Sequence, residues 1–407
     1  MESETIADLH IHGRFSRATS KNLSIETLEK WARIKGVGLL GTGDFTHPEW
    51  IKEIKEQLKE DKNTGILKTK TNFPFLLTTE ISLVFTKENK GRRVHLLILA
   101  PSLEAVSQIT NYFLKKGRID YDGRPIFNIS CAEIVEEMKK IDEMIEIIPA
   151  HAWTPWFGIF GSMSGFDSLK EAFGDKAKDI HAIETGMSSD PEMNWKISEL
   201  NDRAILSFSD AHSFWPFRLG REATIFDFPP EEATYKKVID AIRKNSIKAT
   251  IEVDPAYGKY HWDGHRLCNF SCSPKESQKM HDICPVCGKK LIIGVENRVE
   301  KLTNQGTDKN KNKKPFYKIL PLQELISLLN NSPLASNKSW QIYNKFIDEF
   351  GSEFNVLLHE EKERLARIDE KLAEIILKNR EGKIPVKPGY DGVYGQASLA
   401  ETQKKLF

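Results

Sequence analysis

The chain has 407 residues, of which 40% are hydrophobic and 29% charged, and its formal net charge is +1. This length allows two or three domains with a sizeable core, and the composition is that of an ordinary soluble protein. No apolar run reaches the ~20 residues that cross a bilayer, and residues 1–7 lack a basic start followed by an apolar stretch. We therefore expect no membrane span and no secretory signal, and we place the protein in the cytoplasm.

Up to about residue 255, short apolar runs alternate with helical patterns. Helical faces are expected at Ile25, Leu28 and Ala32 and at Leu103, Val106, Ile109 and Phe113. Buried strands are expected at residues 37–40, 75–79, 94–99, 145–148, 182–183 and 205–208. Alternating β and α elements predict a parallel sheet, either open or closed into a barrel.

Candidate metal ligands accompany these strands. His10 and His12 are two residues apart in a short apolar start, so in a strand both side chains would point the same way. Parallel α/β folds collect their sites at the carboxyl ends of strands. The other candidates near strand ends are Glu80, His95, His151, Asp210 and His212.

A lone buried histidine, such as His95 or His181, is more often a hydrogen-bonded core residue than a ligand. Five histidines and two carboxylates near strand ends, with two pairs at i,i+2 spacing, are hard to explain as unrelated core residues. Imidazoles with a bridging carboxylate suit zinc, manganese or iron, and two such ions ~3.5–4 Å apart form a clamp for phosphoryl displacement. The set therefore predicts a metal site.

Four of the five cysteines form two pairs, Cys268-x3-Cys272 and Cys284-x2-Cys287, whereas Cys131 stands alone. A glycine follows the last of the four, as in a zinc-knuckle turn. In a cytosolic chain this clustering indicates metal ligation rather than disulfides, and four thiolates fit one structural tetrahedral zinc ion. Zinc would supply folding energy to a module too small for its own core.

Positive charge is concentrated between residues 256 and 320, which contain 13 Lys and Arg against 6 Asp and Glu. Together with Tyr260 and Trp262, this composition suits contact with nucleic acid. A solvated linker over residues 309–314 and a module that only braces the domains are the plainer alternatives. We expect a catalytic domain over residues 1–255, a cysteine module over residues 256–297 and a basic, mainly helical, DNA-binding C-terminal region over residues 298–407.

The order of the ligand candidates resembles the polymerase-and-histidinol-phosphatase (PHP) superfamily of metal-dependent phosphoesterases. The residues that carry the resemblance, over roughly residues 5–250, are D-L-H-I-H at 8–12, then Glu80, His95 and His151, and D-A-H at 210–212. The resemblance implies a distorted (β/α)7 barrel and two or three divalent ions, which would be Zn, Mn, Mg or Fe. It assigns one ion to the catalytic set His10, His12, Glu80 and Asp210, and a second to Glu80, His95 and His151.

Two departures from the PHP pattern concern a third ion beside His212. The turn that usually reads T-D-H is Gly43-Asp44-Phe45, with His47 two positions later. The acidic or histidine ligand expected after the first motif is replaced near Arg17. Asp44 or His47 would have to complete such a third site.

Most of the chain is similar to endonuclease Q, a family of DNA repair endonucleases. The strings G-T-G-D-F-T-H-P at 41–48 and P-G-Y-D-G-V-Y-G at 388–395 carry this resemblance, together with the cysteine module. It implies hydrolysis of double-stranded DNA 5′ to uracil, hypoxanthine, xanthine or an abasic site by metal-activated water. No G-x-x-x-x-G-K-[ST] phosphate loop occurs, which argues against a nucleotide-driven motor.

Base recognition and partner binding have weaker signals. Aromatic residues next to ligand candidates are expected to wall a base pocket or wedge the helix, or else to pack as a lid; they are Trp153, Trp156, Phe157, Phe214 and Trp215. The segment from Gln403 to Leu406 begins like the motif by which many repair proteins dock on the sliding clamp. A charged tail without a role is the alternative.

Three other functions remain open from the sequence. A small-molecule phosphatase of the histidinol-phosphate type shares the metal site but gives no role to the cysteine module. A polymerase-associated 3′ exonuclease uses the same barrel but would need a polymerase-sized partner domain. A non-catalytic DNA-binding platform is the third, because Phe45 and Arg17 depart from the ligand pattern.

Overall fold

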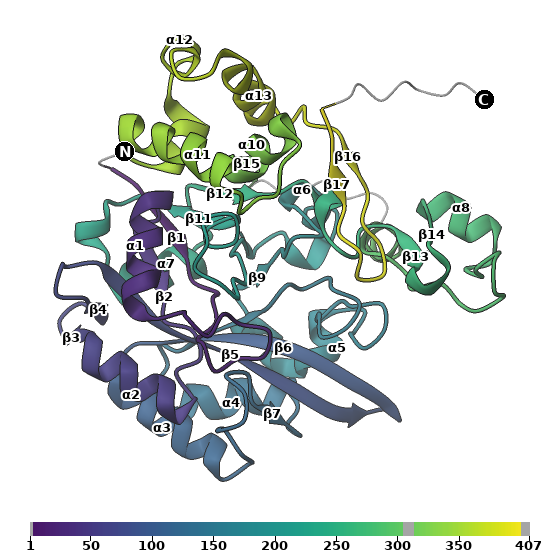
Figure 1. Cartoon of the computed structure of the whole chain (residues 1–407). Coiled ribbons are helices and arrows are strands. Elements are labelled where there is room, and N and C mark those ends of the chain that lie inside the picture. The colour runs from purple at the N-terminus through teal and green to yellow at the C-terminus, as the bar shows by residue number, and fades with distance from the viewer. Residues whose placement is uncertain (1–2, 304–312, 400–407) are drawn as a thin grey trace.

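Strand β1 (Thr5–Asp8) lies at the centre of a mixed sheet that curls into a distorted barrel (Figure 1). It pairs in parallel with β2 (Leu39–Gly41) and antiparallel with β11 (Ala223–Phe226). β2 is followed by β5 (Pro74–Lys87), again in parallel. The computed structural model describes residues 3–303 and 313–399.

The other side of the barrel begins with a long antiparallel hairpin. β5 pairs with β6 (Lys90–Ala100), which pairs antiparallel with β8 (Glu146–Pro149). Next to β8 lies the parallel pair β9 (Ala182–Glu184) and β10 (Ala204–Leu206). Directly after β10, the Ser207 amide donates to Thr224 Oγ1 of β11 at 3.1 Å. This contact closes the barrel between β10 and β11.

Helices with one apolar face cover the barrel. In α1 the expected face of Ile25, Leu28 and Ala32 is buried, and the helix begins at the Ser24 cap and ends at Gly36 with φ of 93°. The barrel helices are α1 (Ile25–Lys35), α2 (Pro48–Gln57), α3 (Leu103–Leu114), α4 (Cys131–Ile141), α5 (Leu169–Phe173), α6 (Pro191–Asn194) and α7 (Tyr235–Arg243). The minor strands of the large sheet are β3 (Lys59–Asp61), β4 (Ile66–Lys68), β7 (Ile126–Phe127) and β12 (Ala249–Glu252).

The sheet is not parallel throughout, which corrects the expectation of a simple parallel arrangement. β5 and β6 are joined by a tight turn in which Glu88 and Asn89 both have positive φ, the geometry of a two-residue hairpin. The strands of this hairpin extend well beyond the predicted runs 75–79 and 94–99. β11 and β12 were not predicted, because Thr224, Thr250 and Glu252 interrupt their apolar pattern and hydrogen-bond inside the protein.

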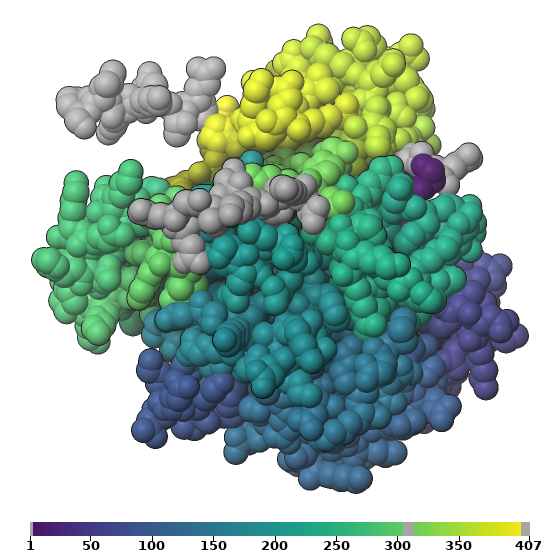
Figure 2. All heavy atoms as spheres, turned by 180° about the vertical axis from the view of Figure 1, so that it is seen from behind, coloured from purple at the N-terminus to yellow at the C-terminus, as the bar shows by residue number. Residues whose placement is uncertain are grey.

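The remaining elements form two smaller lobes beside the barrel (Figure 2). The cysteine module contains β13 (Asp263–His265), β14 (Phe270–Cys272), α8 (Pro274–Lys279) and the start of α9 (Val295–Leu302). The C-terminal region contains β15 (Phe316–Lys318), α10 (Leu322–Asn330), α11 (Asn337–Phe350), α12 (Lys362–Ala366), α13 (Glu370–Arg380), β16 (Val386–Lys387) and β17 (Gln396–Ala397). This arrangement confirms the expected α/β barrel with a cysteine module and a helical C-terminal region.

The lobes are tied to the barrel by strand pairing and by a buried ion pair. β15 adds in parallel to β12, so the C-terminal region contributes a strand to the barrel sheet. Lys35 Nζ lies 2.6 Å from Glu353 Oε1 and 2.7 Å from the Pro216 carbonyl, and both charged side chains are buried. The domain ranges 1–255, 256–297 and 298–407 stay a proposal. Within the described residues, no helix has both the length and the apolar character to span a bilayer.

Candidate active site

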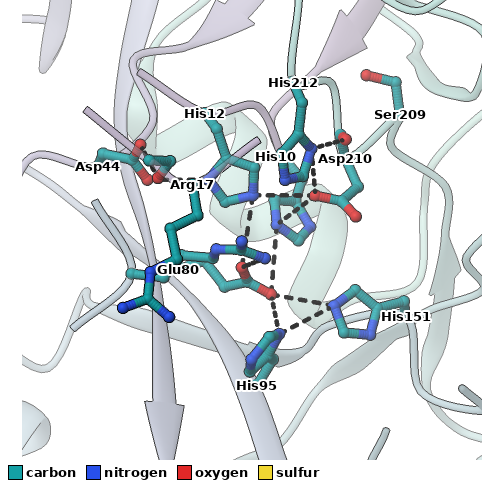
Figure 3. Close-up of polar contacts among 12 residues, drawn as sticks. His10, His12, Arg17, Asp44, Glu80, His95, His151, Ser209, Asp210 and His212 are labelled. Atoms are coloured by element: carbon teal, nitrogen blue, oxygen red, sulfur yellow. Dashed lines mark hydrogen bonds and ion pairs between the residues drawn. The ribbon is translucent and has the colours of Figure 1, made fainter. Parts of the chain in front are cut away.

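The two first histidines meet two carboxylates at one end of the barrel (Figure 3). His12 Nε2 lies 2.9 Å from Asp210 Oδ1 and 3.4 Å from Glu80 Oε2. His10 Nε2 lies 3.6 Å from Glu80 Oε1 and 3.7 Å from Asp210 Oδ1. One ligand atom from each of the four residues lies within 4.8 Å of the others, so they could hold a single ion.

Glu80 also belongs to a second group, with His95 and His151. Its Oε1 lies 2.8 Å from His95 Nδ1 and 3.0 Å from His151 Nε2. The hairpin explains this proximity, because Ser82 pairs with His95, and so Glu80 and His95 are diagonal neighbours on one face. His95 therefore reaches the site from within an antiparallel strand rather than from the carboxyl end of a parallel one.

The two groups fit a pair of divalent ions that share Glu80. His10 Nε2 and Glu80 Oε2 are buried without a hydrogen-bond partner among the described residues. Buried polar atoms are rarely left without a partner, and an ion between these atoms would satisfy both. Imidazole and carboxylate donors are the set that zinc, manganese and iron bind.

Hydrogen bonds behind the rings fix which nitrogen faces the centre. His10 Nδ1 lies 2.9 Å from a Glu184 oxygen, and Glu184 also accepts the His151 amide at 2.9 Å. His151 Nδ1 lies 3.0 Å from Thr154 Oγ1. A ring that donates from one nitrogen presents the lone pair of the other to a metal, as metal-binding histidines commonly do.

Charge in the centre is distributed so that the carboxylates stay ionised. Burial opposes ionisation of Glu80, but His95 and His10 hold its pKa well below the usual range. Burial also opposes protonation of His12, yet Asp44 and Asp210 raise its pKa to about 9. Burial lowers the pKa of His212 to about 4 despite the nearby Asp210. The metal-free centre therefore holds a proton on His12 that an ion must displace.

Asp44 and His47 belong to neither of the two metal groups found around Glu80 in the described part of the chain. Asp44 Oδ1 lies 3.0 Å from His12 Nδ1, and Oδ2 accepts the Gly13 amide at 2.6 Å and Ser16 Oγ at 2.7 Å. Its lone pairs are thereby used inside the protein, so Asp44 orients His12 rather than facing an ion. His47 stacks on the Phe15 ring at 4.6 Å.

His212 was expected as a ligand, but it lies outside both groups. Its ring is 4.5 Å from the His12 ring, and its Nδ1 is 2.9 Å from the Asp210 carbonyl. The roles of Asp44 and His212 as metal ligands stay predictions, since neither residue belongs to the two groups found among the described residues.

A cation that no sequence motif indicated faces the shared carboxylate. Arg124 Nη1 lies 3.6 Å from Glu80 Oε2, with 20% of its side chain exposed. Asp122 holds the loop, because it accepts the Arg124 amide at 3.1 Å and lies 3.3 Å from Arg17 Nε. Any Cβ at Gly123 would lie 2.2 Å from Ser16 Oγ, so only glycine allows this approach. Arg124 has no motif spacing that would reveal it from sequence.

A hollow of about 460 Å³ opens beside His95, His151 and Asp210. Of the five aromatic residues expected at a base pocket, Trp156 and Phe157 line it. The other lining residues include Gly186, Met187, Ser188, Arg221, Glu222, Lys259, Tyr260 and Tyr394. Tyr260 and Tyr394 come from the cysteine module and the C-terminal region, so all three parts of the chain build this hollow.

The other three aromatic residues do not line the hollow, which agrees with the alternative that they pack against the protein. Trp153 is buried in the core, where its indole N–H donates to Asn194 Oδ1 at 2.7 Å. Trp215 packs between Trp31 and Trp340 at ring distances of 5.4 and 5.3 Å, and Phe214 packs on Trp215. Phe214 and Trp215 therefore pack between α1 and α11 instead of facing the hollow.

The cysteine module brings together three of its cysteines and a histidine. One ligand atom from each of His265, Cys268, Cys284 and Cys287 lies within 4.8 Å of the others. Cys272 is outside this group, because it pairs with Asp263 in the β13–β14 ladder, two residues along from His265. The geometry thus favours His265 over Cys272 as the fourth ligand, unlike the expected four-cysteine set. His265-x2-Cys268 repeats the spacing of Cys284-x2-Cys287, and this was the available signal.

Comparison with known proteins finds similarity over different parts of the chain. Residues 321–383 match the family described as MJ0043 C-terminal domain. Protein MJ0043 of Methanocaldococcus jannaschii is 34% identical over 252 residues, which are 61% of this chain and 31% of that protein, so the match spans less than a third of its length. YqxK of Bacillus subtilis is 29% identical over 410 residues, covering 96% of this chain and 98% of YqxK.

Two solved structures are similar over nearly the whole chain. The lesion-specific endonuclease PfuEndoQ from Pyrococcus furiosus has a TM-score of 0.86 at 32% identity, covering 98% of this chain and 96% of that one. Endonuclease Q in complex with a 27-mer duplex that carries an abasic lesion at the active site has a TM-score of 0.87 at 32% identity, covering 98% and 97%.

Proposed function

Because this chain belongs to the endonuclease Q family, we propose that it nicks double-stranded DNA at the phosphodiester 5′ to a deaminated base or an abasic site. It is a metal-dependent phosphodiesterase. The observation that carries the proposal is the hollow next to the shared Glu80 centre, since it places room for an extruded nucleotide beside the groups that would cut its backbone.

The related proteins support the choice of substrate. PfuEndoQ is lesion-specific, and the related complex holds an abasic duplex at its active site. Uracil, hypoxanthine and xanthine are the bases that we propose for this chain. Turning a base out of the stack costs a few kcal/mol and least for a mispaired base, which favours these lesions over normal pairs. Trp156, Phe157 and Tyr260 would supply flat walls for the extruded base.

In the proposed mechanism, His10, His12, Glu80 and Asp210 would hold one divalent ion, and Glu80, His95 and His151 would hold the other. When bound, such ions lower the pKa of a coordinated water and neutralise charge on the leaving oxygen. The water oxygen bonds to phosphorus and loses a proton while the bond from phosphorus to the 3′ oxygen breaks. The leaving 3′ oxygen takes up a proton, which leaves a 3′ hydroxyl and a 5′ phosphate.

The remaining polar residues orient this centre and contact the backbone. Glu184 and Asp44 keep His10 and His12 in the ligating tautomer. Arg124, fixed by Asp122 at the edge of the centre, is the cation that contacts the scissile phosphate.

The cysteine module and the C-terminal region have supporting roles in this proposal. One structural zinc ion, held by His265, Cys268, Cys284 and Cys287, stabilises the module that carries Tyr260 to the hollow. The basic residues of both lobes contact the duplex. The proposed clamp-docking segment, from Gln403 to Leu406, lies outside the described residues.

A nicking assay tests the proposed function. End-labelled duplexes that carry one uracil, one hypoxanthine, one abasic site or no lesion are incubated with Mg²⁺ or Mn²⁺, with a chelator control. We expect a single metal-dependent cut just 5′ to each lesion and none in undamaged DNA. Absence of any cut by metal-loaded protein, with turnover of histidinol phosphate instead, would support the phosphatase alternative. Duplex binding without any hydrolysis would support the non-catalytic platform.

A further inference from the structure

A barrel loop at residues 152–167, called the anchored loop below, is held by a buried arginine of α9. Arg298 is 6% exposed, although it carries a permanent charge. Its Nε donates to the Phe160 carbonyl at 2.8 Å, and its Nη2 donates to the Phe166 carbonyl at 3.0 Å and to Asp167 Oδ1 at 2.7 Å. One side chain of a helix that begins in the cysteine module thus fixes three points of the loop.

The anchored loop contacts both histidines of the second metal group. The His95 amide donates to the Phe157 carbonyl at 2.8 Å, and the rings of these two residues lie 4.3 Å apart. His151 Nδ1 lies 3.0 Å from Thr154 Oγ1. The loop therefore sets where both imidazoles stand relative to Glu80.

The backbone beside these histidines is strained, so its shape depends on contacts from outside. His151 and Phe157 have φ of 31° and 67°, in the left-handed region that residues other than glycine seldom adopt. Strained residues persist where the surrounding structure holds them in place. Arg298 supplies such contacts, and so does Ser162, whose hydroxyl donates to the Ile293 carbonyl at 2.8 Å.

The first turn of α9 is tied to the strand that carries a zinc-ligand candidate. Asp263 of β13 lies two residues before His265. Its Oδ1 accepts the Gly294 amide at 2.6 Å, and its Oδ2 accepts the Asn297 side-chain amide at 2.6 Å. Arg298 follows Asn297 directly, so one helical turn connects the zinc-ligand group with the anchored loop.

We propose that Arg298 is a positioning residue for the second metal group, through which the folded, zinc-bound module raises the affinity of His95 and His151 for a divalent ion. Metal occupancy lies beyond the proposed nuclease function and does not depend on the substrate. The assignment of the metal groups around Glu80 and Cys284 is the premise. Continuous networks of packed and hydrogen-bonded groups can carry such coupling between sites. Linkage makes it reciprocal, so an ion at the second group would also stabilise the module.

The first metal group provides an internal reference, because its histidines are oriented from other elements. Glu184, which contacts His10, belongs to β9, and Asp44, which contacts His12, lies in the loop after β2. Glu80 is common to both groups. Loss of the Arg298 contacts should therefore weaken binding of one ion and not of both.

Manganese titration of the full chain tests this selectivity. A chelator removes the ions around Glu80 while zinc stays in the cysteine module, whose thiolates prefer zinc to manganese. Mn²⁺ is then added back; calorimetry gives its affinities, and electron paramagnetic resonance distinguishes a single Mn²⁺ from a pair that shares a carboxylate. The variants are Arg298→Met and Arg298→Lys. Arg380→Met is the matched control, since Arg380 also donates to two backbone carbonyls, at 2.7 Å each, but within the C-terminal region.

For Arg298→Met we expect about 10-fold or more weaker binding of the second Mn²⁺, with the first within about threefold. Arg298→Lys should show a smaller loss, because an ammonium can still bind one of the two carbonyls. Arg380→Met should keep both affinities. Cys284→Ser, which empties the zinc group, should weaken the second ion as Arg298→Met does. The two substitutions together should add little further loss, because both act through the same contacts.

Other results would overturn the inference. They are unchanged binding of the second ion in Arg298→Met, equal weakening of both ions, losses that add fully in the double variant, and wild-type protein that binds only one Mn²⁺ around Glu80. Thermal unfolding shows whether each variant is folded. If neither Arg298 variant folds while Arg380→Met does, Arg298 is a structural residue and the inference also fails.

The titration contains no DNA, so its failure and that of the proposed function are separate. A negative result leaves the lesion-directed nuclease in place. Wild-type protein that binds two Mn²⁺ ions but nicks no lesion duplex would remove the proposed function and leave the role of Arg298 standing.

Discussion

Asp44 Oδ1 contacts His12 Nδ1 at 3.0 Å, on the side of the ring that faces away from the metal groups. Replacing Asp44 by Asn keeps the shape but removes the charge that favours Nδ1–H, so the ring loses its fixed tautomer. We expect metal affinity to fall about 10- to 100-fold, measured by titration of the metal-free protein with Zn²⁺ or Mn²⁺. Asp120→Asn, on a nearby exposed carboxylate, is the control and should leave the affinity unchanged.

Asp210 belongs to the first metal group and also lines the hollow. Asp210→Asn should abolish nicking because one ligand charge is lost, while the affinity for a lesion duplex stays within a few-fold. A gel-shift titration with chelator present, run beside the nicking assay, measures both. Wild-type rates in this variant would contradict the metal assignment of the first group.

Arg124 provides a permanent positive charge next to the shared carboxylate. Arg124→Met should lower kcat by about 10²- to 10³-fold, as removal of a transition-state donor does in other enzymes. Metal content, measured by elemental analysis, should not change, because Arg124 is not a ligand. Arg118→Met, whose exposed guanidinium pairs with Asp120, is the matched control. A parallel loss of metal in Arg124→Met would assign the residue to the folding of the centre instead.

One substitution in the cysteine module tests whether His265 or Cys272 is the fourth zinc ligand. If His265 is the fourth ligand, Cys272→Ser keeps one zinc ion per chain, whereas Cys284→Ser loses it and destabilises the module. Zinc content after dialysis and thermal unfolding of the whole chain measure the two effects. Zinc loss in Cys272→Ser, with retention in His265→Gln, would restore the four-cysteine site.

The pKa of His12 predicts how the metal-free protein responds to pH. The folded value is about 9, above the unfolded value of 6.5, so protonated His12 stabilises the fold fully below 6.5 and this contribution is lost as pH rises through about 9. The metal-free protein should therefore lose thermal stability between pH 6.5 and 9. Metal-loaded protein should not, because the ion replaces the proton. Identical dependence of thermal stability on pH with and without metal would contradict the assignment of this proton to His12.

The sequence predicted the ligands whose positions follow from strand periodicity. His10 and His12 share a face because strand side chains repeat every two residues, and Glu80, His151 and Asp210 follow or lie in strands that could be recognised as apolar runs. His95 was found although its strand direction was not predicted, since the long hairpin reverses β6 relative to β5.

The residues that the sequence did not indicate depend on contacts between distant loops. Arg124 reaches Glu80 only because Gly123 packs against Ser16. Trp153 and Trp215 follow the ligand candidates His151 and His212 closely in the sequence. The sequence of an aromatic run does not indicate whether its side chains face a hollow or the core. For the cysteine module, the spacing was compatible with either fourth ligand, and the ladder register between β13 and β14 separates His265 from Cys272.

Lys35 connects a loop next to the metal centre to the C-terminal region. Its ammonium contacts both the Pro216 carbonyl, in the loop that follows His212, and Glu353 of the C-terminal region, with no access to water. Breaking a buried pair by removing one partner costs about 3–5 kcal/mol, and here the stranded charge would sit beside the loop that carries Asp210. A chain shortened before Glu353 would leave the Lys35 ammonium buried without its carboxylate partner, so we expect it to lose activity together with the C-terminal region.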